Sequence, residues 1–238
     1  MSNKNKVGRV YIPASGVATN KNKHNEGSPL IRLTGDEFAT TAESALYNLN
    51  DINSDNSGGV LTNNGTVTFA HDSDLGETVG TYNGSSQYLS RATEAQFEVG
   101  TGSFTASIQF KCTSLASGDT IFNYGDLAAS EQNWYIGFSG TAIRCACDDG
   151  TNQALVLDSL SDVYLDNKWH TATMMLDTSL STDTLFLWVD GKLIGSASQA
   201  LVTLNNVGEK LYIGSTNAGG ATDYFNGQLA NFHLIKSA

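Results

Sequence analysis

Hydrophobic and polar residues alternate along most of the chain in the short pattern that is typical of β-strands. The clearest segment is Asp166–Gly195, which contains two apolar runs, Trp169–Leu176 and Leu185–Val189, bounded by Asp, Ser, Thr and Gly. The pair Asp190-Gly191 follows the second run, and Asp-Gly suits a two-residue hairpin because both central positions need a positive φ. The segment therefore predicts three successive antiparallel strands.

Similar signals continue from about residue 60 to residue 238. Ser103–Cys112 alternates apolar and polar residues, which predicts a strand with one buried face and one wet face. In Phe225–Ile235 the apolar positions change from odd to even numbers, which predicts a β-bulge near Ala230. Asn83-Gly84, inside the predicted β segment Thr78–Leu89, is another hairpin signal. The remaining predicted strands are two short pieces of Val60–Phe69, then Thr120–Tyr124, Trp134–Phe138, Ala142–Ala146, Ala154–Leu157 and Leu211–Gly214.

The run Leu185–Val189 is apolar on both faces. Leu185, Leu187 and Val189 share one face of the strand, and Phe186 and Trp188 lie on the other face. A strand of a sandwich needs only one apolar face. We therefore expect Phe186 and Trp188 to be covered by a long loop, by the N-terminal region or by another molecule.

The N-terminal part of the chain is different. Asp36–Leu49 predicts a short helix, because Asp36 is a suitable cap and apolar residues recur at helical spacing. The strands that follow come at intervals of roughly 8–12 residues with tight turns between them, which predicts a β-sandwich or barrel. We therefore expect an all-β protein with an arm over residues 1–35 and one antiparallel sandwich over residues 36–238.

Charge is distributed unevenly between the predicted arm and the sandwich. The first 32 residues hold six Lys or Arg and one acid, which gives a formal charge of +5. Because the whole chain has a net charge of −11, the remaining residues carry −16. Val7–Ile12 could pair as an edge strand, and the arm is otherwise polar and irregular. Basic arms dock onto nucleic acid, membranes or acidic protein surfaces, and a solvated leader is the alternative. We expect a neighbouring subunit to hold the arm through Lys4, Lys6, Arg9, Lys21 and Lys23.

Several classes of protein are excluded by composition. No apolar run approaches the ~20 residues of a membrane span, and the first ten residues, MSNKNKVGRV, lack the apolar core of a secretory signal. A hydrophobic content of 40% excludes a disordered chain. Nucleic-acid binding is disfavoured, because Tyr11 is the arm's one aromatic residue and the acidic domain repels phosphates.

Two patterns raise the question of metal binding. Cys145 and Cys147 form a Cys-x-Cys pair, but with only Cys112 elsewhere we expect three free, buried cysteines. The loop DINSDNSGG places Asp51, Asn53 and Asp55 at alternate positions, as oxygen ligands lie in calcium loops. Its sixth position is Asn rather than Gly and its twelfth is Thr rather than an acid, so an ordinary Asx-turn loop is the alternative.

A family resemblance emerges when the segments are taken in order. The chain resembles the laminin-G-like domains of the concanavalin A-like lectin/glucanase superfamily over residues 50–238. The segments that carry the resemblance are DNSGGVLTNNGTVTF (55–69), YNGSSQYLSRA (82–92), GSFTASIQFKCTS (102–114), TIFNYGD (120–126), NKWHTATMMLD (167–177), LFLWVDGKLIGS (185–196), LYIGS (211–215) and YFNGQLANFHLIKSA (224–238). This resemblance implies a jelly-roll sandwich of two antiparallel sheets, one curved and one flatter.

The resemblance also implies candidate sites. The resemblance implies that loops at the rim of the sandwich supply calcium ligands. Asp126 is therefore a candidate metal ligand in addition to the loop that contains Asp51. Further acids in predicted loops are Asp148, Asp149 and Asp223. Trp134 and Tyr135 are candidates for stacking on a sugar ring, although an aromatic pair in a strand is usually core. The predicted ligand-binding residues are therefore Trp134, Tyr135, Asp148 and Asp149, and the predicted metal ligands are Asp51, Asn53, Asp55 and Asp126.

Catalysis is not expected. The resemblance implies that a catalytic member of the glucanase branch would carry a strand with the motif Glu-x-Asp-x-Glu. No such triplet occurs in this chain. The four histidines have no motif partner for a nucleophile, and His170 beside Trp169 resembles the family's Trp-His pair, which we interpret as structural packing.

Two functions remain. The absence of a signal, the unpaired cysteines and the basic arm lead us to expect a structural protein of a virus particle, most simply a bacteriophage decoration, tail or fibre component assembled in the host cytoplasm. Its partners would be other virion subunits or further copies of itself, and a host-surface glycan is a second possible partner. The alternative is a stand-alone carbohydrate-binding module, with or without calcium.

Overall fold

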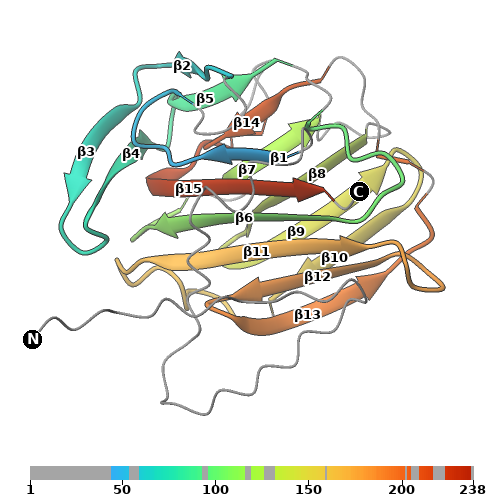
Figure 1. The fold of residues 1–238 in the computed structure, drawn as a ribbon. Helices are drawn as coiled ribbons and strands as arrows, with labels where there is room; N and C mark the ends of the chain where they lie inside the picture. The colour runs from blue at the N-terminus through green and yellow to red at the C-terminus, as the bar shows by residue number, and fades with distance from the viewer. Residues whose placement is uncertain are drawn as a thin grey trace, which may run out of the picture.

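The protein folds as two antiparallel β-sheets packed face to face (Figure 1). The computed structural model describes residues 44–53, 59–92, 96–115, 119–125, 132–158, 160–201, 203–204, 209–216 and 223–236. Every pair of neighbouring strands in these residues is antiparallel, and the described part of the chain contains no helix. The predicted all-β sandwich is confirmed. The same residues contain no helix long and apolar enough to cross a membrane.

One sheet has eight strands. Its order is β13-β12-β11-β6-β15-β4-β3, and β1 pairs with the second half of β15. The strands are β1 (Ser44–Tyr47), β3 (Thr68–Asp72), β4 (Glu77–Asn83), β6 (Phe104–Lys111), β11 (His170–Asp177), β12 (Thr184–Val189), β13 (Lys192–Ser198) and β15 (Asn226–Lys236).

The other sheet has seven strands in the order β10-β9-β8-β7-β14-β5-β2. The strands are β2 (Thr62–Asn64), β5 (Tyr88–Arg91), β7 (Thr120–Gly125), β8 (Gln132–Ser139), β9 (Ala142–Asp149), β10 (Gln153–Leu157) and β14 (Leu211–Ile213). Strands adjacent in the chain often lie in different sheets, so the connections cross between the two layers (Figure 1).

An aromatic cluster fills the space between the sheets. The ring of Trp134 in the seven-stranded sheet lies 5.2 Å from Phe104 of the other sheet, and 5.7 and 5.5 Å from Phe122 and Tyr124 of its own. Phe122 in turn meets Phe232 of β15 at 5.1 Å. Each large apolar side chain removed from water in this way contributes about 1.5–3 kcal/mol to folding. The cluster therefore joins the two sheets near their centres.

The predicted meander at residues 166–195 is confirmed as β11, β12 and β13. Between β12 and β13 the two turn residues Asp190 and Gly191 have φ angles of 52° and 75°, as an Asp-Gly hairpin requires. The predicted bulge in β15 is also confirmed, because the register against β6 shifts between Ala230 and His233. The alternation predicted for Ser103–Cys112 appears as β6, with buried residues at alternate positions through Phe110.

The three cysteines are free and buried, as predicted. Burial raises the pKa of the Cys112 thiol to about 12, and it also raises the pKa values of Cys145 and Cys147. Since the thiolate is the reactive form, these cysteines act as small apolar core residues.

The helix predicted over Asp36–Leu49 is wrong for its second half. Residues Ser44–Tyr47 form β1, which pairs with β15 and buries Tyr47 completely. Pairing with a neighbouring strand thus outweighs the local helical spacing of apolar residues. Residues 36–43, the predicted edge strand Val7–Ile12 and the whole basic arm lie outside the described residues.

The hairpin predicted at Asn83-Gly84 is also wrong. Gly84 does have a positive φ of 69°, but β4 and β5 on either side of it belong to different sheets. The side chain of Asn83 accepts hydrogen bonds from the backbone N–H groups of Ser85 and Ser86, at 3.0 and 3.1 Å. An Asx turn therefore carries the chain from one layer to the other.

Phe186 and Trp188 are half-buried on the outer face of the eight-stranded sheet. Their rings stack on each other with centroids 5.4 Å apart and planes inclined by 26°. The expectation that these side chains are covered is therefore met only in part, and mutual stacking provides some of the cover.

Two glycines provide a matched test of this fold. Gly214 and Gly191 both have positive φ, 86° and 75°, but a Cβ on Gly214 would lie 2.5 Å from Cδ1 of buried Tyr82, whereas a Cβ on Gly191 meets nothing within 4 Å. We predict that Gly191→Ala lowers the free energy of unfolding by about 1–2 kcal/mol. Gly214→Ala should lower it by about 1–3 kcal/mol more, because it adds a steric clash in the core. Urea unfolding measures both, and equal losses would contradict the packing described at Tyr82.

Candidate ligand-binding face

The outer face of the seven-stranded sheet carries an aromatic row. Tyr135 of β8 lies opposite Asn123 of β7, and Asn123 lies opposite Tyr212 of β14. Directly opposed residues of neighbouring strands project to the same face. Trp134, next to Tyr135 in β8, packs in the core, so its neighbour Tyr135 points outward. The row Tyr135–Asn123–Tyr212 thus lies at the middle of the outer face.

Two half-buried tyrosines extend this row. The ring of Tyr88 in β5 lies 6.1 Å from Tyr212 and 6.1 Å from Tyr224, and Tyr224 sits just before β15. Tyr135 and Tyr212 are almost fully buried at 4% exposure each, whereas Tyr88 and Tyr224 retain solvent contact. A tyrosine presents an apolar ring together with a polar hydroxyl, so such a cluster offers both kinds of contact to a ligand.

Arg144 of β9 completes the face. Its Cζ lies 5.2 Å from the centre of the Tyr135 ring, which is a cation–π contact. Burial raises the pKa of Tyr135, while the positive charge of Arg144 acts in the opposite direction. We call Tyr88, Tyr135, Arg144, Tyr212 and Tyr224 the tyrosine face.

Buried polar atoms lie beside this face. The Asn123 amide nitrogen donates to the carbonyl oxygens of Gly125 and Thr216, at 2.7 and 2.6 Å. Among the residues that the structure describes, its amide oxygen has no hydrogen-bond partner, and neither has the hydroxyl of Ser215, although both atoms are buried. A buried polar atom without a partner costs about 1–3 kcal/mol. Polar groups of this kind are suited to a hydroxyl-bearing ligand or to ordered water.

The four predicted ligand-binding residues separate in the structure. Tyr135 lies on the tyrosine face, whereas Trp134 is fully buried between the sheets. Asp148 is half-buried and accepts hydrogen bonds from Gly150 N–H at 2.8 Å and from the Gln153 amide at 3.0 Å. Asp149 is 7% exposed and holds the β9–β10 turn by accepting from the N–H groups of residues 151 and 152. Trp134 and Asp149 therefore have structural roles.

The predicted calcium loop is described only in part. Asp51 accepts from the backbone N–H and the amide of Asn53, at 2.6 and 2.8 Å, which is an Asx turn. Asp55 and Asp126 lie outside the described residues, so the calcium prediction stays a prediction. In the described ranges, no three His, Cys, Asp or Glu side chains gather in a way that could hold a metal ion.

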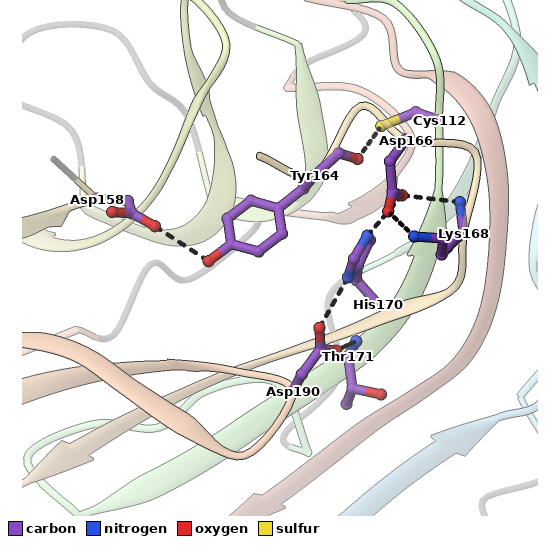
Figure 2. Close-up of polar contacts among 8 residues, drawn as sticks. All are labelled: Cys112, Asp158, Tyr164, Asp166, Lys168, His170, Thr171 and Asp190. Carbon is purple, nitrogen blue, oxygen red and sulfur yellow. Dashed lines mark hydrogen bonds and ion pairs between the residues drawn. The ribbon is translucent and has the colours of Figure 1, made fainter. Parts of the chain in front are cut away.

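His170, the first residue of β11, lies between two carboxylates beside the turn of the β12–β13 hairpin (Figure 2). Its Nδ1 is 2.8 Å from Asp190 and its Nε2 is 3.0 Å from Asp166. Asp190 also accepts from the backbone N–H of Thr171 at 2.9 Å. The imidazole therefore links the loop before β11 to the tip of the hairpin.

The thiol and phenol groups drawn near His170 make hydrogen bonds to groups other than its imidazole (Figure 2). The Cys112 thiol donates to the carbonyl oxygen of Tyr164 at 3.6 Å, and the Tyr164 hydroxyl donates to Asp158 at 3.0 Å. The preceding residue, Trp169, donates its indole N–H to Asp72 at 3.0 Å. These contacts support the interpretation of the Trp-His pair as structural packing.

The sequence did not point to Tyr88, Arg144, Tyr212 or Tyr224. Tyr88, Tyr212 and Tyr224 lie in segments that carry the family resemblance, but nothing in those segments marks the three tyrosines as neighbours of one another or of Arg144. A weak signal was available in Leu211–Ile213, where a tyrosine sits between two aliphatic residues and must point away from them on a strand. Only the order of strands in the sheet reveals that such residues are neighbours.

This architecture, a two-sheet sandwich with an aromatic outer face, defines a lectin-like class of protein. Residues 83–238 match the family described as the concanavalin A-like lectin/glucanases superfamily. The chain therefore belongs to this superfamily, as its resemblance to laminin-G-like domains predicted. A comparison with curated proteins finds no match.

Three solved structures show the fold that this chain shares. The binding domain of Paraclostridial Mosquitocidal Protein 1 has a TM-score of 0.62 and 16% identity, over 83% of this chain and 49% of that chain. Domain 4 of AbnA, a GH43 extracellular arabinanase from Geobacillus stearothermophilus, solved with arabinotriose, has a TM-score of 0.58 and 14% identity over 82% and 92%. A structure of botulinum neurotoxin type C, whose cell entry depends on interaction with two ganglioside molecules, has a TM-score of 0.60 and 12% identity. The match covers 85% of this chain and 49% of that chain. The chain thus spans about half the length of the first and third.

The His170 cluster predicts how stability depends on pH. Hydrogen bonding to Asp190 raises the pKa of His170, burial opposes this, and bonding to Asp166 adds to it. Because the folded pKa lies above the ordinary 6.5, the stabilisation is complete below pH 6.5 and is lost as the pH rises through the folded pKa. We therefore predict that wild-type protein loses stability between about pH 6 and about pH 8, as measured by urea unfolding, and that His170→Gln loses much less.

A second histidine provides the internal control for this measurement. Burial lowers the pKa of His233 to about 4. The effect of His233 on stability therefore has the opposite sign to that of His170, and it is confined to pH values below 6.5. Parallel pH profiles of wild type and His170→Gln above pH 6.5 would show that the cluster is not protonated as described.

Proposed function

We propose that the protein is a non-catalytic carbohydrate-binding module and that the tyrosine face is its binding site. The observation that carries the proposal is the gathering of aromatic rings on one outer face, where the half-buried Tyr88 and Tyr224 adjoin Tyr212 of the row Tyr135–Asn123–Tyr212. The outer face of a sheet ordinarily meets water, so aromatic side chains gathered there indicate a binding surface.

The chemistry of the face suits a sugar. A pyranose or furanose ring has an apolar side formed by C–H groups and a rim of hydroxyls, and binding sites combine apolar walls with a few placed polar groups. The rings of Tyr88 and Tyr224 are accessible for stacking. Arg144 is half-buried, and its guanidinium can donate to ligand oxygens.

The neighbouring structures support binding without catalysis. The mosquitocidal protein's domain is a binding domain, and cell entry of botulinum neurotoxin type C depends on interaction with two ganglioside molecules. The domain of AbnA was solved with arabinotriose. The chain also lacks the Glu-x-Asp-x-Glu strand expected of the glucanase branch.

The second function, a structural component of a virus particle, stays a prediction. It rests on the basic arm, whose residues lie outside the described ranges. The two functions are compatible, since a virion protein can display a glycan-binding face. Deletion of residues 2–32 tests the arm separately from the tyrosine face.

The binding site can be tested on a glycan array with calorimetric follow-up of the strongest ligand. We predict that wild type binds saturably and that Tyr88→Ala and Tyr224→Ala each weaken binding by about two- to twelvefold, because one aromatic contact is worth about 0.5–1.5 kcal/mol. Both residues are partly exposed, so their truncation should leave the fold intact.

Trp188→Ala is the matched control. Trp188 is a half-buried aromatic residue on the outer face of the other sheet, and its loss should leave glycan affinity unchanged. Equal weakening by Trp188→Ala and Tyr88→Ala would move the site away from the tyrosine face. Absence of binding to any glycan would overturn the proposed function.

A further inference from the structure

A cavity of about 240 Å³ lies at one end of the sandwich, where β11 ends and β12 begins. These strand ends adjoin the start of β6, at the right of Figure 1. The cavity is lined by residues 100–101 before β6, by residues 176, 178 and 183 around the β11–β12 loop, and by residues 201, 203 and 204 after β13. None of these residues belongs to the tyrosine face, so the cavity is a separate site. Pockets for drug-sized ligands measure about 300–1,000 Å³, so this cavity suits a smaller molecule.

Three leucines form the apolar wall of the cavity. Leu176 and Leu204 are buried, and Leu201 is half-buried. The backbone N–H of Leu204 donates to the carbonyl oxygen of Gly100 at 2.9 Å, which ties two of the lining segments together. Such a wall can cover the aliphatic stem of a ligand, and each methylene removed from water is worth about fourfold in affinity.

Asp183 is the one ionisable residue among the described residues that line the cavity. Its side chain is half-buried, and one carboxylate oxygen accepts from the backbone N–H of Leu201 at 3.1 Å. Within the described part of the chain, the other carboxylate oxygen has neither a hydrogen bond nor an ion pair. A partly buried charge is stabilised by an opposite charge, so this carboxylate favours a ligand that carries a cation.

Threonine hydroxyls add further acceptors to the cavity. Thr101 is exposed, and Thr178 is half-buried beside Ser103. The Thr178 and Ser103 hydroxyl oxygens lie 3.2 Å apart, and the Thr178 N–H donates to the same Ser103 oxygen at 2.9 Å, which fixes the position of Thr178. A hydroxyl has two lone pairs, so it can accept from a ligand while it donates elsewhere. An ammonium group has three donors and no acceptor, and it matches this set of oxygens.

We propose that this cavity binds a small primary amine, with the ammonium group at Asp183 and the aliphatic stem against the three leucines. A primary alkylamine is positively charged at neutral pH, as a lysine side chain is. The chain has a net charge of −11, which attracts cations to its surface. An anionic ligand finds no positive side chain among the described residues of the cavity wall. The amine site goes beyond carbohydrate binding and does not depend on the tyrosine face.

Titration of the full-length protein with 1-pentylamine, followed by two-dimensional NMR, tests the site. At about 150 mM NaCl, which screens exposed charges, we expect saturable binding with a Kd of about 1 mM and shifts of the Thr101 and Thr178 amide signals. 1-Pentanol has a similar stem without the charge, and it should bind about five- to tenfold more weakly because hydrogen bonds to charged groups are the stronger ones. Methylamine lacks most of the stem and should bind at least about tenfold more weakly. Pentanoate should not bind.

Asp183→Asn removes the charge and keeps an oxygen that can accept from Leu201 N–H. This variant should bind 1-pentylamine about five- to tenfold more weakly and 1-pentanol as well as wild type does. Asp162→Asn is the matched control, because it changes the net charge equally at an exposed residue in the loop before β11, whereas the cavity adjoins the end of β11. Its affinity for 1-pentylamine should equal that of wild type.

Three results overturn the amine site. The first is the absence of saturable 1-pentylamine binding, and the second is equal affinity for 1-pentylamine and 1-pentanol, which indicates an apolar cavity only. The third is an unchanged 1-pentylamine affinity in Asp183→Asn. Nα-acetyl-lysine N-methylamide presents the same group as part of a peptide, and tighter binding of this compound than of 1-pentylamine contradicts the assignment to a free amine. Tyr88→Ala should leave amine binding unchanged, so failure of the amine site and failure of the tyrosine face are distinguishable.

Discussion

Cross-sheet aromatic packing is the constraint on which the rest of the molecule depends. Trp134, Phe122 and Phe104 meet between the layers, and this contact decides which face of each strand is buried. Because side chains alternate along a strand, burying Trp134 and Phe122 forces Tyr135 and Asn123 to the outside. The aromatic outer face is therefore a direct consequence of the core rather than a separate feature.

Polar anchors hold the connections that the core leaves free. Lys111 is buried and bonds to Asp72 and Asp74 at 3.0 and 2.8 Å, and Trp169 donates to the same Asp72. Although burial alone raises the pKa of Asp72, hydrogen bonds from Trp169, Leu75 N–H and Lys111 lower it to about 2. A buried charge is stable only when paired in this way. Together with the His170 cluster, these contacts fasten the loop before β11 to the hairpin turns.

The two sheets present different outer surfaces. The eight-stranded sheet shows the stacked pair Phe186 and Trp188, and the seven-stranded sheet combines tyrosines with arginine and buried polar atoms. Binding sites for small molecules combine apolar walls with a few polar groups, and the outer face of the seven-stranded sheet has this combination.

The sequence alone determined the fold class, the β11–β13 meander, the bulge in β15 and the buried cysteines, because each depends on local alternation or turn chemistry. It also indicated the superfamily and placed one residue of the binding face, Tyr135. It could not determine β1, since pairing with β15 overrides a helical pattern, nor that Asn83-Gly84 joins two sheets. The neighbourhood of Tyr88, Tyr212 and Tyr224 was decided only by the tertiary structure, because strand order brings together residues that are far apart in the chain.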